Sequence, residues 1–217
     1  MTLGYYLRRL CSTKDERGRR TSDWFRLFVR RAVRKMVSDN ADSILDAGGG
    51  DGLLFDPNVS RCAGVTTILD MDIKALHEVK RYYGGKGHFA GGDLTRMPFE
   101  DGSFGTAVCI GTFYNFPSAD MVFKGLCEMA RVTGKEGRMI VEFRNAENPL
   151  VSLAYKYAGL YDSSLNGLPL NAYSLKQIKS MLSRAGLEAK RIKTIGIPLK
   201  MLAFSYILEA VHRESEK

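Results

Sequence analysis

Glycine and aspartate cluster directly after three short apolar runs of the chain. The first cluster lies in residues 44–52, Ile-Leu-Asp-Ala-Gly-Gly-Gly-Asp-Gly. Glycine permits a positive φ and lets a ligand approach the backbone, and the amides that open a helix attract a carboxylate or phosphate. The glycines at 48, 50 and 52 match neither the dinucleotide fingerprint nor the G-x-x-x-x-G-K-[ST] phosphate loop. A tight strand-to-helix turn without a ligand is the alternative interpretation.

An acidic residue follows each of the next two apolar runs. Asp72 can accept hydrogen bonds from both hydroxyls of a ribose, which leaves Asp70 as a local structural partner. Asp93 can accept from an exocyclic amine, while the Leu94 amide can donate to an adenine ring. One Gly-Asp pair is usually a turn, but three such sites at successive strand ends predict a nucleoside cofactor. The predicted cofactor-binding residues are Asp46, Gly48, Gly49, Gly50, Asp72, Ile73, Asp93, Leu94, Ile110 and Gly111.

These clusters fall within an alternation of apolar runs and amphipathic helical patterns that begins at Asp42 and is typical of a parallel-sheet α/β protein. Ser174 is predicted to cap a helix, with Gln177 completing a capping box. The predicted strands are residues 43–47, 65–72, 88–93, 106–110, 138–143, 188–195 and 203–212. The predicted helices are residues 22–37, 73–83, 120–132 and 174–185.

The composition is that of a globular protein, with 217 residues, 45% hydrophobic and 26% charged. It excludes disorder, collagen and a disulfide-stapled miniprotein. The longest stretch without a charge, residues 102–119, is too polar to span a bilayer. Because the start of the chain does not resemble a signal peptide, we expect a cytoplasmic protein with four reduced cysteines. Their spacing predicts no zinc site, and no other metal is expected.

The net charge of +8 arises in the first 35 residues, which hold eleven Lys or Arg against three acids. The predicted helix over residues 22–37 has an apolar face, which includes Phe28, and an opposite face of Lys35 and arginines, which include Arg30. This basic helix can pack on the sheet with its arginines in solvent. It can also contact an anionic substrate or an acidic membrane surface, which Trp24 and Phe25 suit. RNA binding is least favoured, because no RNA-binding module accompanies the helix.

Taken together, the motifs resemble those of a class I S-adenosylmethionine-dependent methyltransferase of the small-molecule type, similar to the ubiquinone/menaquinone methyltransferases. Residues 46–52 resemble the D-x-G-x-G-x-G loop of that family, Asp72 matches its ribose-binding acid, and Asp93-Leu94 matches its adenine contact. Residues 97–104 resemble its L-P-F-x-D-x-S-F segment, and residues 130–138 its A-R-V-L-K-P-G-G-R turn.

The resemblance implies a Rossmann-like, doubly wound α/β fold: a seven-stranded sheet, mostly parallel with an antiparallel last strand, and helices on both faces. It implies S-adenosyl-L-methionine as methyl donor and S-adenosyl-L-homocysteine as product. The implied acceptor is an O, N or C nucleophile of a small metabolite or lipid-linked intermediate. An RNA (tRNA or rRNA) methyltransferase and a non-catalytic partner protein on the same fold are the alternatives. The family pattern is broken at Gly105, which replaces an Asp, and at residues 133–136, which lack a Pro.

The same resemblance places the acceptor beyond the fourth strand, in residues 111–117. Methyl transfer from a sulfonium requires a nucleophile that is held close and aligned, with water excluded. Tyr114 and Asn115 are the predicted catalytic residues, and an aromatic pocket wall without a catalytic role is the alternative. Glu142 and Arg144 are alternatives for binding or proton transfer, and catalysis by positioning alone needs no base.

Three parts of the chain follow from this interpretation. Residues 1–41 form a basic arm and helix, and residues 42–217 form the methyltransferase domain. The Tyr-rich insertion 145–173 is long for a plain connection and is predicted to close over the pocket as a substrate cap. The expected partner is a small-molecule substrate, anionic or lipid-linked, and nucleic acid is not expected.

Overall fold

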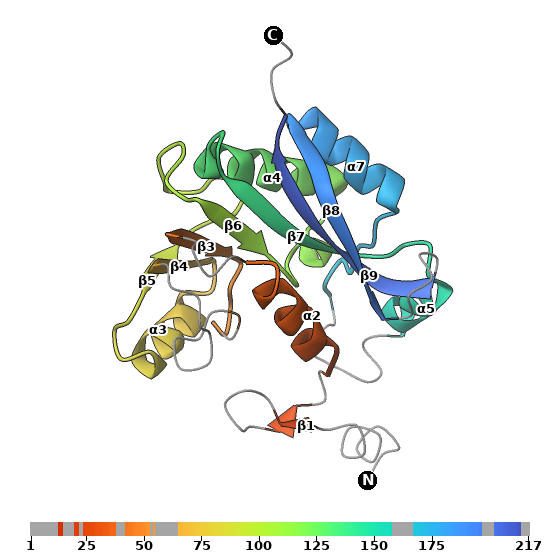
Figure 1. Ribbon diagram of the computed structural model, residues 1–217. Coiled ribbons are helices and arrows are strands. Elements are labelled where there is room, and N and C mark those ends of the chain that lie inside the picture. Colours follow the sequence, from red (N-terminus) through yellow and green to blue (C-terminus); the bar gives the residue numbers. More distant parts are fainter. Residues whose placement is uncertain are drawn as a thin grey trace.

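Seven strands form one sheet in the order β5-β4-β3-β6-β7-β9-β8 (Figure 1). The computed structural model describes residues 13–14, 20–21, 24–37, 42–52, 54, 65–157, 167–196 and 202–213. The strands of the sheet are β3 (Ser43–Ala47), β4 (Val65–Asp70), β5 (His88–Gly91), β6 (Thr106–Cys109), β7 (Arg138–Arg144), β8 (Leu187–Gly196) and β9 (Ala203–His212).

The pairing of these strands confirms the predicted doubly wound sheet. Strands β5, β4, β3, β6 and β7 are parallel, and β9 runs antiparallel to both β7 and β8. The chain builds outward from β3 to β4 and β5 and then returns to β6 on the other side of β3. Ligands of open α/β sheets bind at such a reversal, beyond the carboxyl ends of the strands. The topology therefore places a site beside the loops after β3 and β6.

Helices cover both faces of the sheet (Figure 1). On one face α4 and α7 cover the large core around Leu126 and Ile178, and on the other α2 and α3 cover smaller clusters around Val33 and Val79. The capping box that the sequence predicts at Ser174 is present at the start of α7. The helices are α2 (Trp24–Arg34), α3 (Ile73–Tyr82), η1 (Phe113–Asn115), α4 (Ala119–Thr133), α5 (Pro149–Lys156) and α7 (Leu175–Arg184).

The sequence-based boundaries differ from the structure at a few elements. Strand β4 ends at Asp70 rather than at residue 72, because Asp72 is the N-cap of α3. Strand β5 ends at Gly91 rather than at residue 93. The short ribbon of β1 (Thr13–Lys14) and β2 (Arg20–Thr21), and the helices η1 and α5, were not predicted. Among the described residues, none of the helices is long and apolar enough to cross a membrane.

Val29 and Val33 of α2, and Met36 just after the helix, are buried in one cluster with Ile44 of β3. The sequence assigns Phe28 to this apolar face, but 55% of the side chain is exposed.

Candidate cofactor and acceptor pocket

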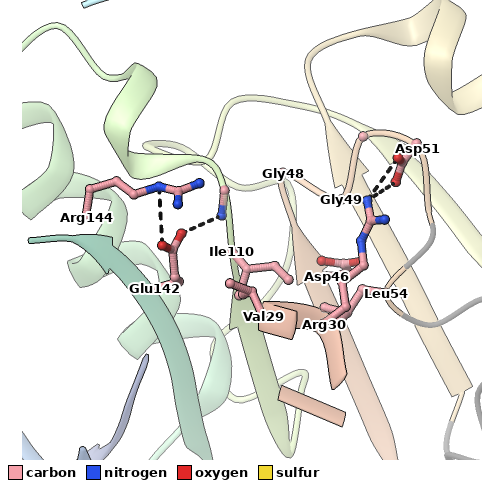
Figure 2. Close-up of a pocket in the computed structure, with 12 residues that line it drawn as sticks. Val29, Arg30, Asp46, Gly48, Gly49, Asp51, Leu54, Ile110, Glu142 and Arg144 are labelled. Atoms are coloured by element: carbon pink, nitrogen blue, oxygen red, sulfur yellow. Dashed lines mark hydrogen bonds and ion pairs between the residues drawn. The ribbon is translucent and has the colours of Figure 1, made fainter. Parts of the chain in front are cut away.

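A pocket lies at the carboxyl ends of β3, β6 and β7, with α2 as a further wall (Figure 2). Figure 2 shows an arginine–acid pair on each side of it, with the glycine loop and Ile110 between them. The pocket is lined by Val29, Arg30, Asp46, Gly48, Gly49, Gly50, Asp51, Leu54, Ile110, Gly111, Glu142 and Arg144.

The glycine loop after β3 turns sharply at the pocket. Gly48 and Gly50 have φ angles of 75° and 48°, in the left-handed region that favours glycine. The Gly48 amide donates to the Leu69 carbonyl at 2.7 Å, and the Gly50 amide donates to Oδ2 of Asp70 at 2.8 Å. These two hydrogen bonds fix the glycine loop to β4, so its backbone lines the pocket.

Asp46 is a buried acid at the bottom of this pocket, with 1% of its surface exposed. Burial, and next to it the charge of Asp51, raise the pKa of the Asp46 carboxyl to about 7, against the lowering effect of Arg30. Its Oδ2 atom has no hydrogen-bond partner among the described residues. A buried carboxylate oxygen without a donor is costly, so this position suits a ligand that brings a hydrogen-bond donor, above all a cation.

Two arginines of α2 hold the glycine loop and the segment after it. Arg30 donates from Nη2 to both carboxylate oxygens of Asp51 at 3.0 Å, and its side chain is 10% exposed. Arg34 donates from Nε to the Leu54 carbonyl at 2.6 Å. The sequence assigns Arg30 to a solvated face and not to the site. The available signal was its position one residue from Val29 on a helix whose apolar face must pack on the sheet.

A second charged group lies at the other side of the pocket, at the end of β7. Glu142 is 2% exposed and accepts from the Gly111 amide at 3.1 Å. The Arg144 guanidinium lies 3.5 Å from the Glu142 carboxylate and 5.3 Å from the ring centre of Tyr114. The Tyr114 ring also lies 6.3 Å from the ring of Tyr155 in α5. This side of the pocket therefore combines a paired arginine with aromatic rings behind it.

Six of the ten residues predicted to bind the cofactor line the pocket: Asp46, Gly48, Gly49, Gly50, Ile110 and Gly111. The other four lie outside the lining. Asp72 caps α3 by accepting from the Lys74 and Ala75 amides, and Ile73 is 50% exposed beside it. Asp93 accepts from the amide and hydroxyl of Thr95 in a turn, and Leu94 packs its side chain in the core.

The two predicted catalytic residues also lie outside the pocket lining. Tyr114 reaches it only through Arg144, and its carbonyl accepts from the Asn171 amide at 2.7 Å. Oδ1 of Asn115 is buried without a hydrogen-bond partner among the described residues. Glu142 and Arg144, which the sequence offered as alternatives for binding or proton transfer, do line the pocket.

The sequence is similar to a known family of domains and to a curated protein. Residues 45–141 match a family model described as a methyltransferase domain. A demethylmenaquinone methyltransferase from Mycolicibacterium gilvum (strain PYR-GCK) is 46% identical over 132 residues. Residues 45–141 are therefore similar to a methyltransferase domain, as the motifs in the same stretch imply. The curated match covers 59% of this chain and 54% of the relative, so the chain spans about half the length of the curated relative it matches.

Solved structures of methyltransferases share the fold of this chain. A magnesium protoporphyrin IX methyltransferase from Synechocystis PCC 6803, solved with S-adenosylhomocysteine, has a TM-score of 0.67 and 20% identity over 88% of this chain and 87% of that one. A mitomycin 7-O-methyltransferase has a TM-score of 0.69 and 17% identity over 89% of this chain and 55% of that one. At these identities the likeness concerns the fold alone.

The sequence motifs imply S-adenosylmethionine as the ligand of this pocket, and the pocket residues fit it. The cofactor carries the ammonium and carboxylate of an amino acid at one end. Oδ2 of Asp46 accepts no hydrogen bond from the described residues and suits the ammonium. The positively charged guanidinium of Arg30 suits the carboxylate. A Cβ on Gly111 would meet no atom within 4 Å, so space for a ligand remains beside that backbone.

Proposed function

We propose that this protein transfers a methyl group from S-adenosylmethionine to an O, N or C nucleophile of a small organic or lipid-linked acceptor. The observation that carries the proposal is the pair of opposite charges beside the glycine loop. Asp46 offers a buried carboxylate oxygen without a donor, and Arg30 lies above the loop as a nearly buried cation. This arrangement suits the zwitterionic end of an amino acid, which neither NAD nor ATP contains.

The amino-acid end of the cofactor is proposed to bind between Asp46 and Arg30. Asp46 accepts from the ammonium, and Arg30 donates to the carboxylate. Asp51 holds Arg30 by two hydrogen bonds at 3.0 Å and thus competes with the cofactor carboxylate for the same guanidinium. The bound cofactor supplies the methyl group on a sulfonium that needs no further activation.

For the ribose, the geometry favours Asp70 over Asp72, the acid that the sequence favoured. The Asp70 carboxylate lies at the glycine loop, where it accepts from the Gly50 amide and also from the Asp72 amide. The Asp72 carboxylate instead lies at the start of α3, where its Oδ1 accepts from two amides of that helix. The adenine is proposed to bind beyond it, against the exposed Ile73 and the Asp93-Leu94 turn.

The acceptor is proposed to bind on the Arg144 side of the pocket. The Arg144 guanidinium can orient an acidic oxygen of the acceptor, and the Tyr114 and Tyr155 rings behind it offer an aromatic surface. Glu142 fixes Arg144 and the Gly111 amide, so its role is positioning. Relatives named for demethylmenaquinone, magnesium protoporphyrin IX and mitomycin support a small organic acceptor.

The parts around the domain are proposed to close this pocket. Residues 1–41 contribute α2, of which Val29 and Arg30 already line it. The insertion 145–173 contributes α5, whose Tyr155 lies next to Tyr114, while residues 158–166 of it lie outside the described residues. A cytoplasmic location remains a prediction.

The test is methyl transfer from radiolabelled S-adenosylmethionine to demethylmenaquinone reduced to its quinol, with bulk tRNA in a parallel reaction. Label in the organic extract, lost in Arg144→Gln, is the expected result. Label in the RNA would instead establish the nucleic-acid alternative. Micromolar binding of S-adenosylhomocysteine without turnover on a panel of phenols, quinols and amines would favour the non-catalytic alternative.

A further inference from the structure

A second cavity, separate from the cofactor pocket, lies between α2 and the edge strand β8. It holds about 560 Å³. Buried Ala32 and Ile195 line it together with three exposed cations, Arg31, Lys35 and Lys193, which we call the groove cations. Among the residues that the structure describes, no acid lines this cavity.

The groove cations differ from their neighbours on the same two elements. In α2, Arg30 is paired with Asp51 at 3.0 Å, and in β8, Arg191 is paired with Glu209 at 2.8 Å. No ion pair is found for the groove cations within the described part of the chain. Three exposed positive charges that line one groove attract an anionic partner.

An aromatic side chain accompanies these charges. Phe28 lines the groove and is 55% exposed, and it lies on the same stripe of α2 as Arg31 and Lys35, at spacings of three and seven residues. The opposite stripe, with Val29 and Val33, packs on the sheet. Helix α2 therefore presents to the groove a stripe that is both cationic and apolar.

We propose that the groove between α2 and β8 docks the protein on an anionic phospholipid bilayer. The groove cations lie where they can meet lipid phosphates, and the Phe28 ring can enter the boundary between headgroups and acyl chains. A single-stranded nucleic acid would instead need a basic track with several aromatic platforms, whereas this groove has one aromatic ring and buried apolar residues within it.

Docking at this groove has a consequence for the proposed function. Helix α2 contributes Phe28 and Arg31 to the groove and Val29 and Arg30 to the cofactor pocket. The bilayer would therefore lie beside the helix that forms a wall of the pocket, which suits a lipid-linked acceptor. Docking itself does not depend on methyl transfer, so it is tested without turnover.

The test is co-sedimentation of the full chain with vesicles of phosphatidylcholine alone or with about 30% phosphatidylglycerol, at low and high salt. We expect binding to the anionic vesicles only, and weaker binding at high salt. In the triple variant R31Q/K35Q/K193Q, each lost charge weakens binding about fivefold, which multiplies to about a hundredfold. The three side chains are exposed, so the melting temperature should not change.

The matched control is K80Q/K124Q/K179Q, which removes the same charge from exposed lysines of α3, α4 and α7. Docking at the groove requires that this control binds anionic vesicles within about threefold of the wild type, since its lysines lie outside the proposed surface. Equal loss in both triple variants, or no loss in the groove variant, overturns the proposal. A groove variant that loses affinity for a 20-nucleotide RNA more than for vesicles overturns it in favour of RNA.

Discussion

Replacing Asp46 by Asn separates a ligand-binding role of this buried acid from a structural one. The side chain is 1% exposed and its Oδ2 has no hydrogen-bond partner among the described residues, so an amide of the same shape breaks no hydrogen bond of that atom. The substitution removes the charge and replaces one acceptor oxygen by an amide donor of the same size. If that charge holds the cofactor ammonium, affinity falls while the free protein keeps its stability.

The magnitude follows from the geometry and from the raised pKa. A hydrogen bond to a charged group contributes about 1.5–3 kcal/mol, so the loss in affinity is about 10- to 150-fold. Burial raises the pKa of Asp46 to about 7 in the folded protein, from an ordinary value of 3.8. The folded state thus binds the proton more tightly, and this group contributes less stability as the pH rises from about 4 to about 7. At pH 8 Asn therefore leaves the melting temperature unchanged or raises it.

The assay is calorimetric titration with S-adenosylhomocysteine at pH 8 and pH 5.5, together with thermal unfolding. Because the ionised carboxylate is the acceptor, wild-type affinity should fall about thirtyfold at pH 5.5, whereas that of D46N should be flat. Glu136→Gln, which neutralises an exposed acid, serves as the control. The reasoning fails if D46N binds within about threefold of the wild type, or if it unfolds well below the wild type at pH 8.

Substitutions of other acids and of Arg30 at the pocket, and of Gly134 in the turn after α4, have the following expected effects. Asp70→Ala should weaken S-adenosylhomocysteine binding at least about tenfold (roughly 1.4 kcal/mol). Asp72→Ala should leave this affinity unchanged but lower the free energy of unfolding by about 1 kcal/mol, because a helix cap is lost. The reverse pattern would show that Asp72 binds the ribose. In the same titration, Arg30→Met should weaken binding about tenfold or more, while Asp51→Asn, which releases Arg30, should leave it unchanged or stronger. Gly134→Ala should lower the free energy of unfolding in urea by about 1–3 kcal/mol, because φ is 65° and the new Cβ would lie 2.9 Å from the Gly102 Cα; an unchanged midpoint would contradict this.

The sequence predicted the sheet and its covering helices because their signals are local. All seven strands of the sheet were anticipated within one or two residues, since buried parallel strands are short apolar runs bounded by turns. Helix α5 was missed although its start carries a signal. Asn148 accepts from the Leu150 amide and Pro149 opens the helix, a common N-terminal pattern.

The site was only partly predictable because some of its residues meet through packing alone. The glycine loop and Asp46 are adjacent in sequence, so one motif revealed them. Arg30 lies 21 residues from Asp51, and Arg144 reaches the pocket from the end of β7. Neither pairing has a local signature, and the only hint for Arg30 was its position next to Val29, on a helix whose apolar face must pack on the sheet.

Helix α2 shows why a two-face description of an amphipathic helix loses functional information. Val33 faces the core, Arg30 is turned toward the glycine loop, and Arg31 lines the groove beside β8, so consecutive basic residues have different surroundings. Arg30 is 8% exposed and paired through Nη2 with Asp51, so a ligand in the pocket shares its charge with Asp51 or competes for it. Arg31 is exposed, and its charge is screened by salt. Salt should therefore weaken lipid docking far more than cofactor binding, although both charges come from one turn of the same helix.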